Sequence, residues 1–396
     1  MKKDLKNAKT KLAKEIDNLS DEMREIANSI FDNPETCYTE NFAASLLTSK
    51  LKERGFAVES PYLGLSTAFI AKNAKIIKSK PIIAILAEYD ALPGIGHACG
   101  HNLIAASAFG AAVALKNVLH PELGNVVTIG TPAEEGGGGK IKMIRRGAFS
   151  DIDAAIMIHP SNKTRIISRM YAITELKFTF IGKAAHAAAF PEQGINALDA
   201  GVLCYNSISS LRQQIRGNSR VHGIFTYGGD APNIIPDRIE MHYFVRDLDK
   251  KHSEELLKRI KQCAKGAAKA TGCKVKIKTC GNSYDPFYPS YPMGEAFADN
   301  LAILGIADGG FSETTEIGSS DIGNLSQVVP TLHPEYAVGD KEDINHSRNF
   351  LAAVKTQSGH KAMLEMTKAM AMTVYDLLTN HALLKRTKDN FNQSTH

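Results

Sequence analysis

The chain has 396 residues, of which 43% are hydrophobic and 22% are charged, and its formal net charge is only +5. This composition is typical of a soluble globular protein, and the length favours two domains. The small charge is spread along the chain, which argues against nucleic-acid binding, and no apolar run reaches the roughly 18 residues that a membrane span requires. We therefore expect a cytoplasmic protein with no nucleic-acid partner and no membrane partner.

The N-terminal region has a helical pattern. In segment 1–19 lysines and acidic residues recur at helical spacing, which favours a solvated helix over a membrane-surface anchor. In segment 20–54 apolar residues recur every three or four positions, with one interruption at "DNPE". That pattern predicts two helices.

Three apolar runs of strand length follow, and they begin with "PIIAIL", "NVVTIG" and "DAAIMI". Runs that are apolar throughout and rich in Ile, Val and Ala are typical of strands buried on both faces of an α/β sheet. The alanine-rich segment 102–119 lies between the first two runs. It has a suitable length for the helix that connects two parallel strands.

The pattern changes near residue 170, where "ITELKFTFIGKAAHA", "RIEMHYFVRDLD" and "KVKIKTC" alternate between apolar and polar residues, with helical segments between them. This order indicates an α+β unit of the split βαβ, ferredoxin-like kind, which we place at 169–284. The larger domain would then consist of 1–168 and 285–396. We predict an α/β fold, in which a mixed sheet has helices on both faces and carries the α+β unit as an insertion.

Residues with reactive side chains follow each of the three apolar runs. They are Glu88, Asp90, Cys99 and His101 after the first run, Glu134 and Glu135 after the second, and His159 after the third. The carboxyl ends of parallel strands meet at one edge of a sheet, so we expect these side chains to lie together. A single histidine after a strand is more often structural, but the three sets together predict a metal site.

The donor types limit the metal and suggest a division of roles. Carboxylates, imidazoles and one thiolate suit Zn, Mn or Co better than Mg or Ca. The side chains of Glu134 and Glu135 diverge, so one can bind metal while the other takes a proton from an activated water. Asp90 fits a position behind an imidazole ligand, which it would orient. The six cysteines have no framework spacing, so we expect no disulfides.

Five motifs, in their order and spacing, resemble a known family: "AEYDALPGIGHACGHN", "PAEEGGGGK", "IHP", "GKAAHAAAFPEQGINALDA" and "PNIIPD". The chain resembles, over nearly its whole length, the aminoacylase and carboxypeptidase family of dinuclear metallopeptidases. It is most similar to the branch with aminobenzoyl-glutamate hydrolase and the aminoacylase-like dipeptidases. The resemblance implies a metal-dependent amidohydrolase that cleaves small dipeptides or N-acyl amino acids with a metal-activated water. It also implies two divalent ions (Zn or Mn, or Co), and a homodimer or higher homo-oligomer in which the insertion is the dimerisation or lid domain.

The resemblance also implies a role for each site residue. Cys99 would bridge the two ions, and the terminal ligands would be His101, Glu135 and His159. Glu134 would be the general base, and Asp90 would support the site. The last ligand is a late histidine: its place after a strand favours His333, whereas the "HS" motif favours His346, which we choose. His333 would then line the substrate cavity or support the ligands.

Three further residues are implied within the insertion. His186 matches a histidine that reaches across a dimer interface and stabilises the oxyanion. Asn233 and Arg246 match residues that hold the carboxylate of the substrate, and a surface ion pair with a neighbouring aspartate is the alternative for Arg246. Asn102 replaces the aspartate that many relatives have, which favours the dipeptidase type. Glu88 stands where distant relatives place a metal-binding histidine.

Three other functions fit parts of the pattern. One is a metallopeptidase that cuts longer peptides. A second is a catalytically inactive relative that binds peptides or amino acids, although the adjacent pair Glu134 and Glu135 argues against it. A third is a thiol enzyme that uses Cys99, which would resist chelators and be inactivated by alkylation.

Overall fold

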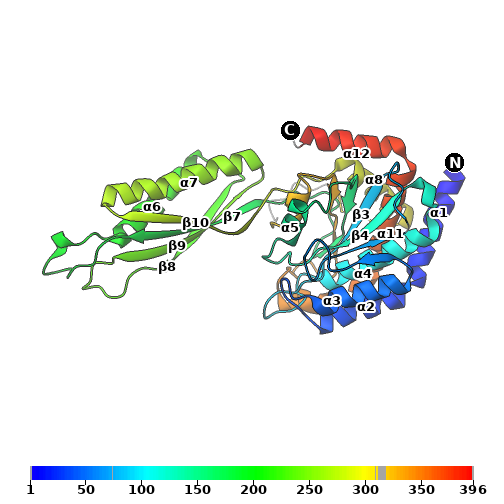
Figure 1. Cartoon of the computed structure of the whole chain (residues 1–396), viewed down its shortest axis with the longest axis horizontal. Coiled ribbons are helices and arrows are strands. Elements are labelled where there is room, and N and C mark those ends of the chain that lie inside the picture. Colours follow the sequence, from blue (N-terminus) through cyan, green and yellow to red (C-terminus); the bar gives the residue numbers. More distant parts are fainter. Residues whose placement is uncertain (1, 74, 308, 311–317, 395–396) are drawn as a thin grey trace. The chain divides into compact units, whose positions relative to one another are not determined.

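The computed structural model describes residues 2–73, 75–307, 309–310 and 318–394, and it divides into two compact units (Figure 1). The larger unit contains the chain up to Arg169 and most of the chain from Tyr288 onwards. Among the described residues, the inserted unit is formed by Met170–Phe287 together with 318–319. Our expected insertion, 169–284, therefore differs from this division by one residue at its start and three at its end.

The larger unit is built on a six-stranded mixed sheet. Its strand order is β1 (Ala57–Glu59), β2 (Phe69–Lys72), β4 (Asn125–Gly130), β3 (Ile82–Ala87), β5 (Ala154–Ile156) and β11 (Thr331–Leu332). The strands β4, β3, β5 and β11 run parallel, whereas β1 and β2 form an antiparallel edge. A two-stranded sheet pairs β6 (His159–Ser161) with β12 (Glu335–Ala337). Both faces of β3 are buried, as its continuous apolar run predicts.

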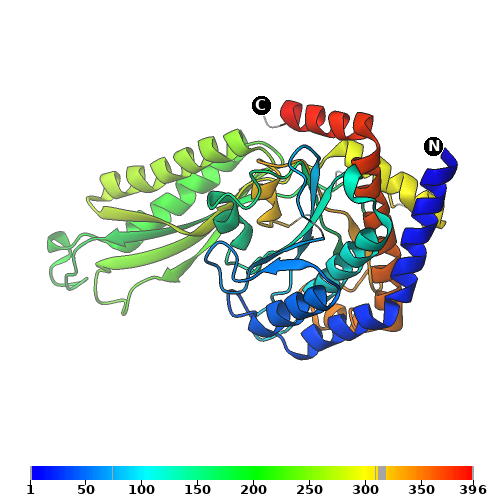
Figure 2. The same ribbon diagram turned by 45° about the vertical axis from the view of Figure 1, so that its right-hand side comes forward.

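The helices of the larger unit cover this sheet (Figures 1 and 2). They are α1 (Lys2–Asn18), α2 (Ser20–Asp32), α3 (Asn41–Glu53), α4 (His101–Val118), α5 (Gly139–Arg145), α8 (Tyr291–Leu304), α9 (Ile322–Leu325), α10 (Arg348–Ala353), α11 (Gln357–Thr379) and α12 (His381–Ser394). Short 3-10 turns occur at Pro121–Leu123 here, and at Pro191–Gln193 and Arg212–Gln214 in the inserted unit. No helix among the described residues is long and apolar enough to cross a membrane.

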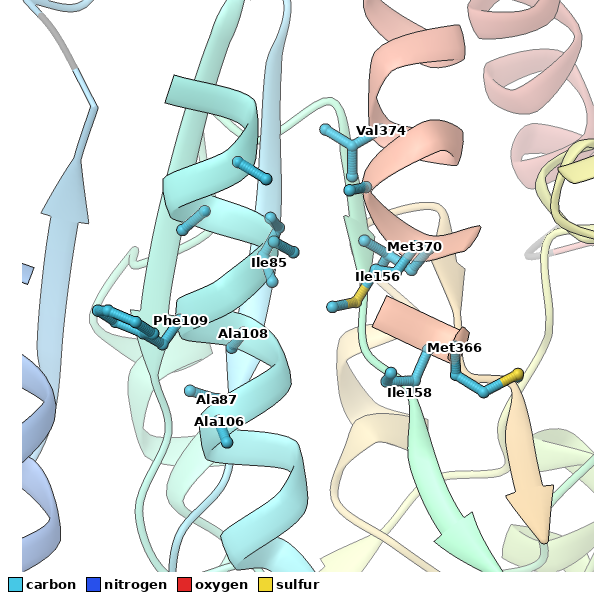
Figure 3. Close-up of a cluster of buried hydrophobic side chains, with 14 of the residues drawn as sticks. Ile85, Ala87, Ala106, Ala108, Phe109, Ile156, Ile158, Met366, Met370 and Val374 are labelled. Atoms are coloured by element: carbon cyan, nitrogen blue, oxygen red, sulfur yellow. The ribbon is translucent and has the colours of Figure 1, made fainter. Parts of the chain in front are cut away.

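The core of the larger unit forms around α4, which is buried from His101 to Leu115. Its alanines let neighbouring helices approach closely, and α1, α2, α3 and α11 all pack against it. Met366, Met370 and Val374 recur every four residues on α11 and belong to the buried cluster that also contains Ile85 and Ile156 (Figure 3). Helix α4, the predicted connection between β3 and β4, therefore lies at the centre of the core of the larger unit.

Helix α1 differs from our expectation of a solvated helix. The segment is helical, but Leu12 and Ile16 are fully buried in the main core. The Lys9 ammonium donates hydrogen bonds to Asn300 Oδ1 and Asp376 Oδ2, both at 2.7 Å. The abundant lysines conceal a narrow apolar stripe, and this stripe is what packs against α4 and α11.

The inserted unit is an antiparallel sheet with two helices on one face (Figure 1). The strand order is β10 (Lys274–Tyr284), β7 (Ala172–Ile181), β9 (Arg238–Asp247) and β8 (Arg220–Tyr227). Alternate apolar residues of β7 and β9 pack against α6 (Ala197–Leu211) and α7 (Lys250–Thr271). The alternation predicts this half-buried sheet. We did not single out β8, which lies at the sheet edge.

Candidate metal centre

The candidate site lies at the carboxyl ends of the parallel strands of the larger unit. Asp90 follows β3, Glu134 follows β4, and β6 begins at His159. The turn into α4 depends on Gly100, whose φ is 82° and whose missing Cβ would lie 2.9 Å from Pro160 Cβ. A glycine is required there because a side chain would be strained and would clash. This turn brings Cys99 and His101 up to the strand ends.

Three groups of candidate metal ligands result. Each group has ligand atoms within 4.8 Å of one another: Cys99, His101 and His159; Cys99, Glu135 and His346; and His101, Glu134 and Glu135. The Cys99 Sγ lies 3.6 Å from His159 Nε2, and the His346 Nε2 lies 3.3 Å from Glu135 Oε1. Cys99, His101 and Glu135 each belong to two of these groups, so the three groups form one continuous cluster of donor atoms.

Backbone and carboxylate contacts fix the orientation of two imidazoles. His101 Nδ1 lies 2.9 Å from the Asp90 carbonyl and 3.1 Å from its Oδ1, and His159 Nδ1 lies 2.7 Å from the Pro160 carbonyl. A carbonyl oxygen can only accept, so each Nδ1 carries the proton and each Nε2 is left to bind a cation. The second Asp90 oxygen accepts from the Glu135 backbone N–H at 2.9 Å. Asp90 thus contacts the His101 imidazole and the Glu135 backbone.

The adjacent glutamates have opposite pKa shifts. Burial raises the pKa of Glu134 well above its ordinary value, and the neighbouring Glu135 and Glu88 raise it further. Burial also acts against ionisation of Glu135, but the hydrogen bond to His346 and the charge of His101 lower the pKa of Glu135. Two carboxyl groups whose pKa values are pushed apart suit different tasks. The two glutamates therefore differ in the direction of their pKa shifts, as a division of roles between them would need.

The donor set fits divalent metal ions. Burial raises the pKa of the Cys99 thiol, so a thiolate at this position needs a bound cation to stabilise it. His101 Nε2 is buried and finds no hydrogen-bond partner among the described residues. An unpartnered buried nitrogen is costly unless it has another function. Cys99, His101, His159, Glu135 and His346 could hold the two ions.

The two candidate histidines near the C-terminus occupy different places. His346 has a positive φ of 70°, and its backbone N–H is held by the Ala98 carbonyl at 2.8 Å. Its ring nitrogen Nε2 lies 3.3 Å from Glu135 Oε1. His333 follows β11 and is buried, with its ring centroid 5.2 Å from that of His159, and it belongs to none of the three groups. The geometry favours His346 as the ligand and His333 as a neighbour of His159.

A buried ion cluster beside the site was missed by the sequence analysis. Lys140 pairs with Glu88, and its Nζ lies 2.7 Å from Asp321 Oδ1, while all three side chains are almost fully buried. The other Glu88 oxygen lies 3.5 Å from His101 Nε2. Glu88 is therefore neutralised by a lysine. In the sequence, Lys140 is marked only by its place after "GGGG", and this segment lacks the G-K-[ST] of a phosphate-binding loop. Nothing there indicates that the lysine is buried in an ion cluster.

The inserted unit brings together two of its three predicted residues. The exposed His186 and Asn233 are neighbours, since the Ala187 N–H donates to the Asn233 carbonyl at 3.0 Å. His186 Nδ1 accepts from the Ala188 and Ala189 N–H groups, so Nε2 carries the proton and can donate.

Arg246 lies at the other end of the same sheet. It is opposite Ile173, at the start of β7, whereas His186 lies beyond Ile181 at the end of that strand. At ~3.3 Å per residue, the eight steps between these two positions span about 26 Å. Asn233 and Arg246 of one chain therefore do not meet. The Arg246 guanidinium donates to Ser319 Oγ at 2.9 Å and not to the neighbouring aspartates that were the alternative.

Comparisons with known proteins identify chains that are similar to this one in sequence and in fold. Residues 171–272 match the peptidase dimerisation domain of the M20 family. The chain is 38% identical to the Xaa-Arg dipeptidase of Mus musculus over 98% of this chain and 93% of that protein. It is 31% identical to a p-aminobenzoyl-glutamate hydrolase polypeptide of Escherichia coli over 94% and 92% of the two chains. A dinuclear metal-binding peptidase of the M20 family from Bacillus subtilis has a TM-score of 0.73 at 21% identity, covering 92% and 99%.

Proposed function

Because the chain belongs to the M20 peptidase family, we propose that it is a metal-dependent amidohydrolase that cleaves small dipeptides or N-acyl amino acids. The observation that supports this most directly is the meeting of five metal donors with an adjacent glutamate of raised pKa. The name of the mouse relative favours dipeptides with a C-terminal arginine as first substrates, and that of the bacterial relative favours aminobenzoyl-glutamate. The cytoplasmic location stays a prediction.

In the proposed mechanism, Glu134 moves the proton. When bound by Cys99 and its neighbours, two divalent ions (Zn or Mn, or Co) would polarise the scissile carbonyl and acidify a water. The Glu134 carboxylate, whose Oε2 lies 3.9 Å from His101 Nε2, takes a proton from the attacking water and returns it to the leaving nitrogen. Asp90 keeps the His101 ring in the ligating orientation.

We propose that the active form is a homodimer joined through the inserted unit. The edge strand β8 exposes Ile224 and Phe225, and the adjoining α6 exposes Leu203 and Tyr205. An apolar, unpaired edge is a favourable site for pairing with a second copy. Two-fold pairing of β8 with itself is antiparallel, so it would bring the His186 end of one sheet toward the Arg246 end of the other. This arrangement would supply His186 from the second copy, as the resemblance implies, and it would bring the neighbouring Asn233 with it.

The dimer proposal predicts a change in oligomeric state. Ile224→Lys places a charge on the edge strand at a side chain that is 64% exposed, and it should convert the dimer to a monomer with reduced turnover. Ile303→Lys is the matched control. It makes the same substitution at an isoleucine of α8 that is 58% exposed, and this variant should stay dimeric. Light scattering after size exclusion measures both. A dimeric, fully active Ile224→Lys protein would contradict this interface.

The function itself is tested by amino-acid release from a substrate panel. The panel holds dipeptides with C-terminal arginine, N-acetyl and N-benzoyl amino acids, and aminobenzoyl-glutamate. Chelation should abolish release, and reloading with Mn, Zn or Co should restore it, because the buried thiol and imidazoles have no catalytic role without the ions.

Each other outcome points to one of the alternatives. Hydrolysis of peptides with a blocked C-terminus would indicate a peptidase for longer chains. Release that survives chelation and is lost on alkylation would indicate a thiol enzyme. No release with any metal, from a folded protein that binds the panel compounds, would indicate a binding protein.

A further inference from the structure

The turn that carries the two glutamates is held in a strained conformation. Ala133, directly before Glu134, has a φ of 61°, a region that residues with a Cβ rarely adopt. The turn closes through hydrogen bonds from Gly136 N–H to the Glu134 carbonyl (2.7 Å) and from Gly137 N–H to the Ala133 carbonyl (3.1 Å). Strained residues persist only where their surroundings hold them in place. The direction of the Glu134 side chain thus depends on what holds Ala133.

A buried carboxylate from another part of the chain supplies that support. Glu40 lies just before α3 and is fully buried. Its Oε1 accepts from the backbone N–H groups of Ala133 (2.9 Å) and Tyr38 (2.8 Å), and its Oε2 accepts from Thr67 Oγ1 (2.8 Å). The carboxylate therefore connects three segments that are distant in sequence, and one of them is the glutamate turn.

A second contact from the same segment reaches the far side of the turn. The Tyr38 hydroxyl donates to the Gly137 carbonyl at 2.7 Å, so the turn is held on both sides of Glu134 and Glu135. The Thr67 carbonyl in turn accepts from the Tyr89 hydroxyl at 2.5 Å, and Tyr89 directly precedes Asp90. Glu40 is thus at the centre of a hydrogen-bonded network that joins the two loops of the metal centre.

We propose that Glu40 is a positioning residue, which holds the Ala133 backbone so that Glu134 is aimed at the attacking water. This inference rests on the proposed function. Glu40 acts through hydrogen-bond geometry, and its negative charge is not required. Burial raises the pKa of Glu40, which means that this environment favours the neutral form of the side chain.

Two substitutions with opposite properties test the inference. In Glu40→Gln the amide oxygen can accept from Ala133 and Tyr38 while its NH₂ donates to Thr67, so all three bonds survive without the charge. Glu40→Asp keeps the charge, but its shorter side chain cannot span all three partners. We expect Glu40→Gln to retain kcat within about threefold. We expect Glu40→Asp to lose about 10²-fold in kcat, with little change in KM and with both metal ions bound, because small displacements of a catalytic group cost about this much.

Thr67→Val is the matched control for stability. It removes one bond to Glu40 and leaves the bond to Ala133, so its melting temperature should fall while kcat stays within about threefold of the parent. Hydrogen exchange gives a readout that needs no turnover. The peptide that contains the Ala133 amide should exchange faster in Glu40→Asp than in the parent or in Glu40→Gln.

The outcomes separate this inference from the proposed function. A parent protein that hydrolyses nothing in the panel would contradict the function, whereas the exchange result would still test the Ala133 contact. With an active parent, loss of kcat in Glu40→Gln or full activity in Glu40→Asp would overturn the positioning role. A loss of kcat in Thr67→Val as large as that in Glu40→Asp would also overturn it, since turnover would then follow stability.

Discussion

Glu134→Ala is expected to lower kcat by about 10²–10⁴-fold, the usual contribution of a positioned general base. Glu134 is the glutamate whose pKa burial and Glu135 raise, and removing it leaves the attacking water without a proton acceptor. The ligands that we propose are Cys99, His101, His159, Glu135 and His346, and Glu134 is not among them. The variant should therefore bind two metal ions, as measured by elemental analysis after dialysis.

Two companion variants make that result specific. Glu134→Gln keeps the shape of the side chain and should be as inactive as Glu134→Ala, since an amide is not a base. Glu135→Ala removes a proposed ligand, whose Oε1 lies 3.3 Å from His346 Nε2, so this variant should lose metal as well as turnover. Turnover that persists in Glu134→Ala would assign the base to another group. Loss of metal in that variant would make Glu134 a ligand.

The parts of the fold and site that depend on local pattern were predictable from sequence. Apolar runs predicted the buried parallel strands, and the residues that follow them predicted a common edge, because the ends of parallel strands meet. Cys99 and His101 lie at the start of α4, where the alanine-rich pattern placed a helix. His159 could be assigned to the site because it directly follows the third apolar run.

The parts that depend on long-range contacts were not predictable. Lys140 follows four glycines, where a solvent-exposed lysine would be expected. It is buried instead, and its ammonium donates a hydrogen bond to Asp321, 181 residues away. Glu40 has its partners at Thr67 and Ala133, and nothing in its local sequence indicates them. The positions of Asn233 and Arg246 show a different limit. The resemblance assigns both residues to the carboxylate of one substrate. Only the register of β7 and β9 reveals that these two residues lie far apart within a single chain.

Lys140→Met is expected to destabilise the larger unit by about 3–5 kcal/mol, the usual cost of breaking a buried ion pair. Burial alone would lower the pKa of Lys140, but Asp321 and Glu88 hold it above its ordinary value, so the lysine is charged. Its removal leaves two carboxylates without a cation. Urea unfolding followed by hydrogen exchange in peptides of the larger unit measures the change. Lys361→Met, which breaks the exposed pair with Glu365, should have little effect.

The cost should come from the carboxylates that remain, and a combined variant can show this. If Lys140 stabilised the unit mainly by filling space, methionine would replace most of its packing and the loss would be small. If it neutralises Glu88 and Asp321, converting them to Gln and Asn in the Lys140→Met protein should recover part of the lost stability, because no charge is then left unpaired. A triple variant no more stable than Lys140→Met would refute the electrostatic role. Glu88 Oε2 lies 3.5 Å from His101 Nε2, so the metal content of the same variants, measured by elemental analysis, would test whether the lysine keeps this carboxylate from binding metal.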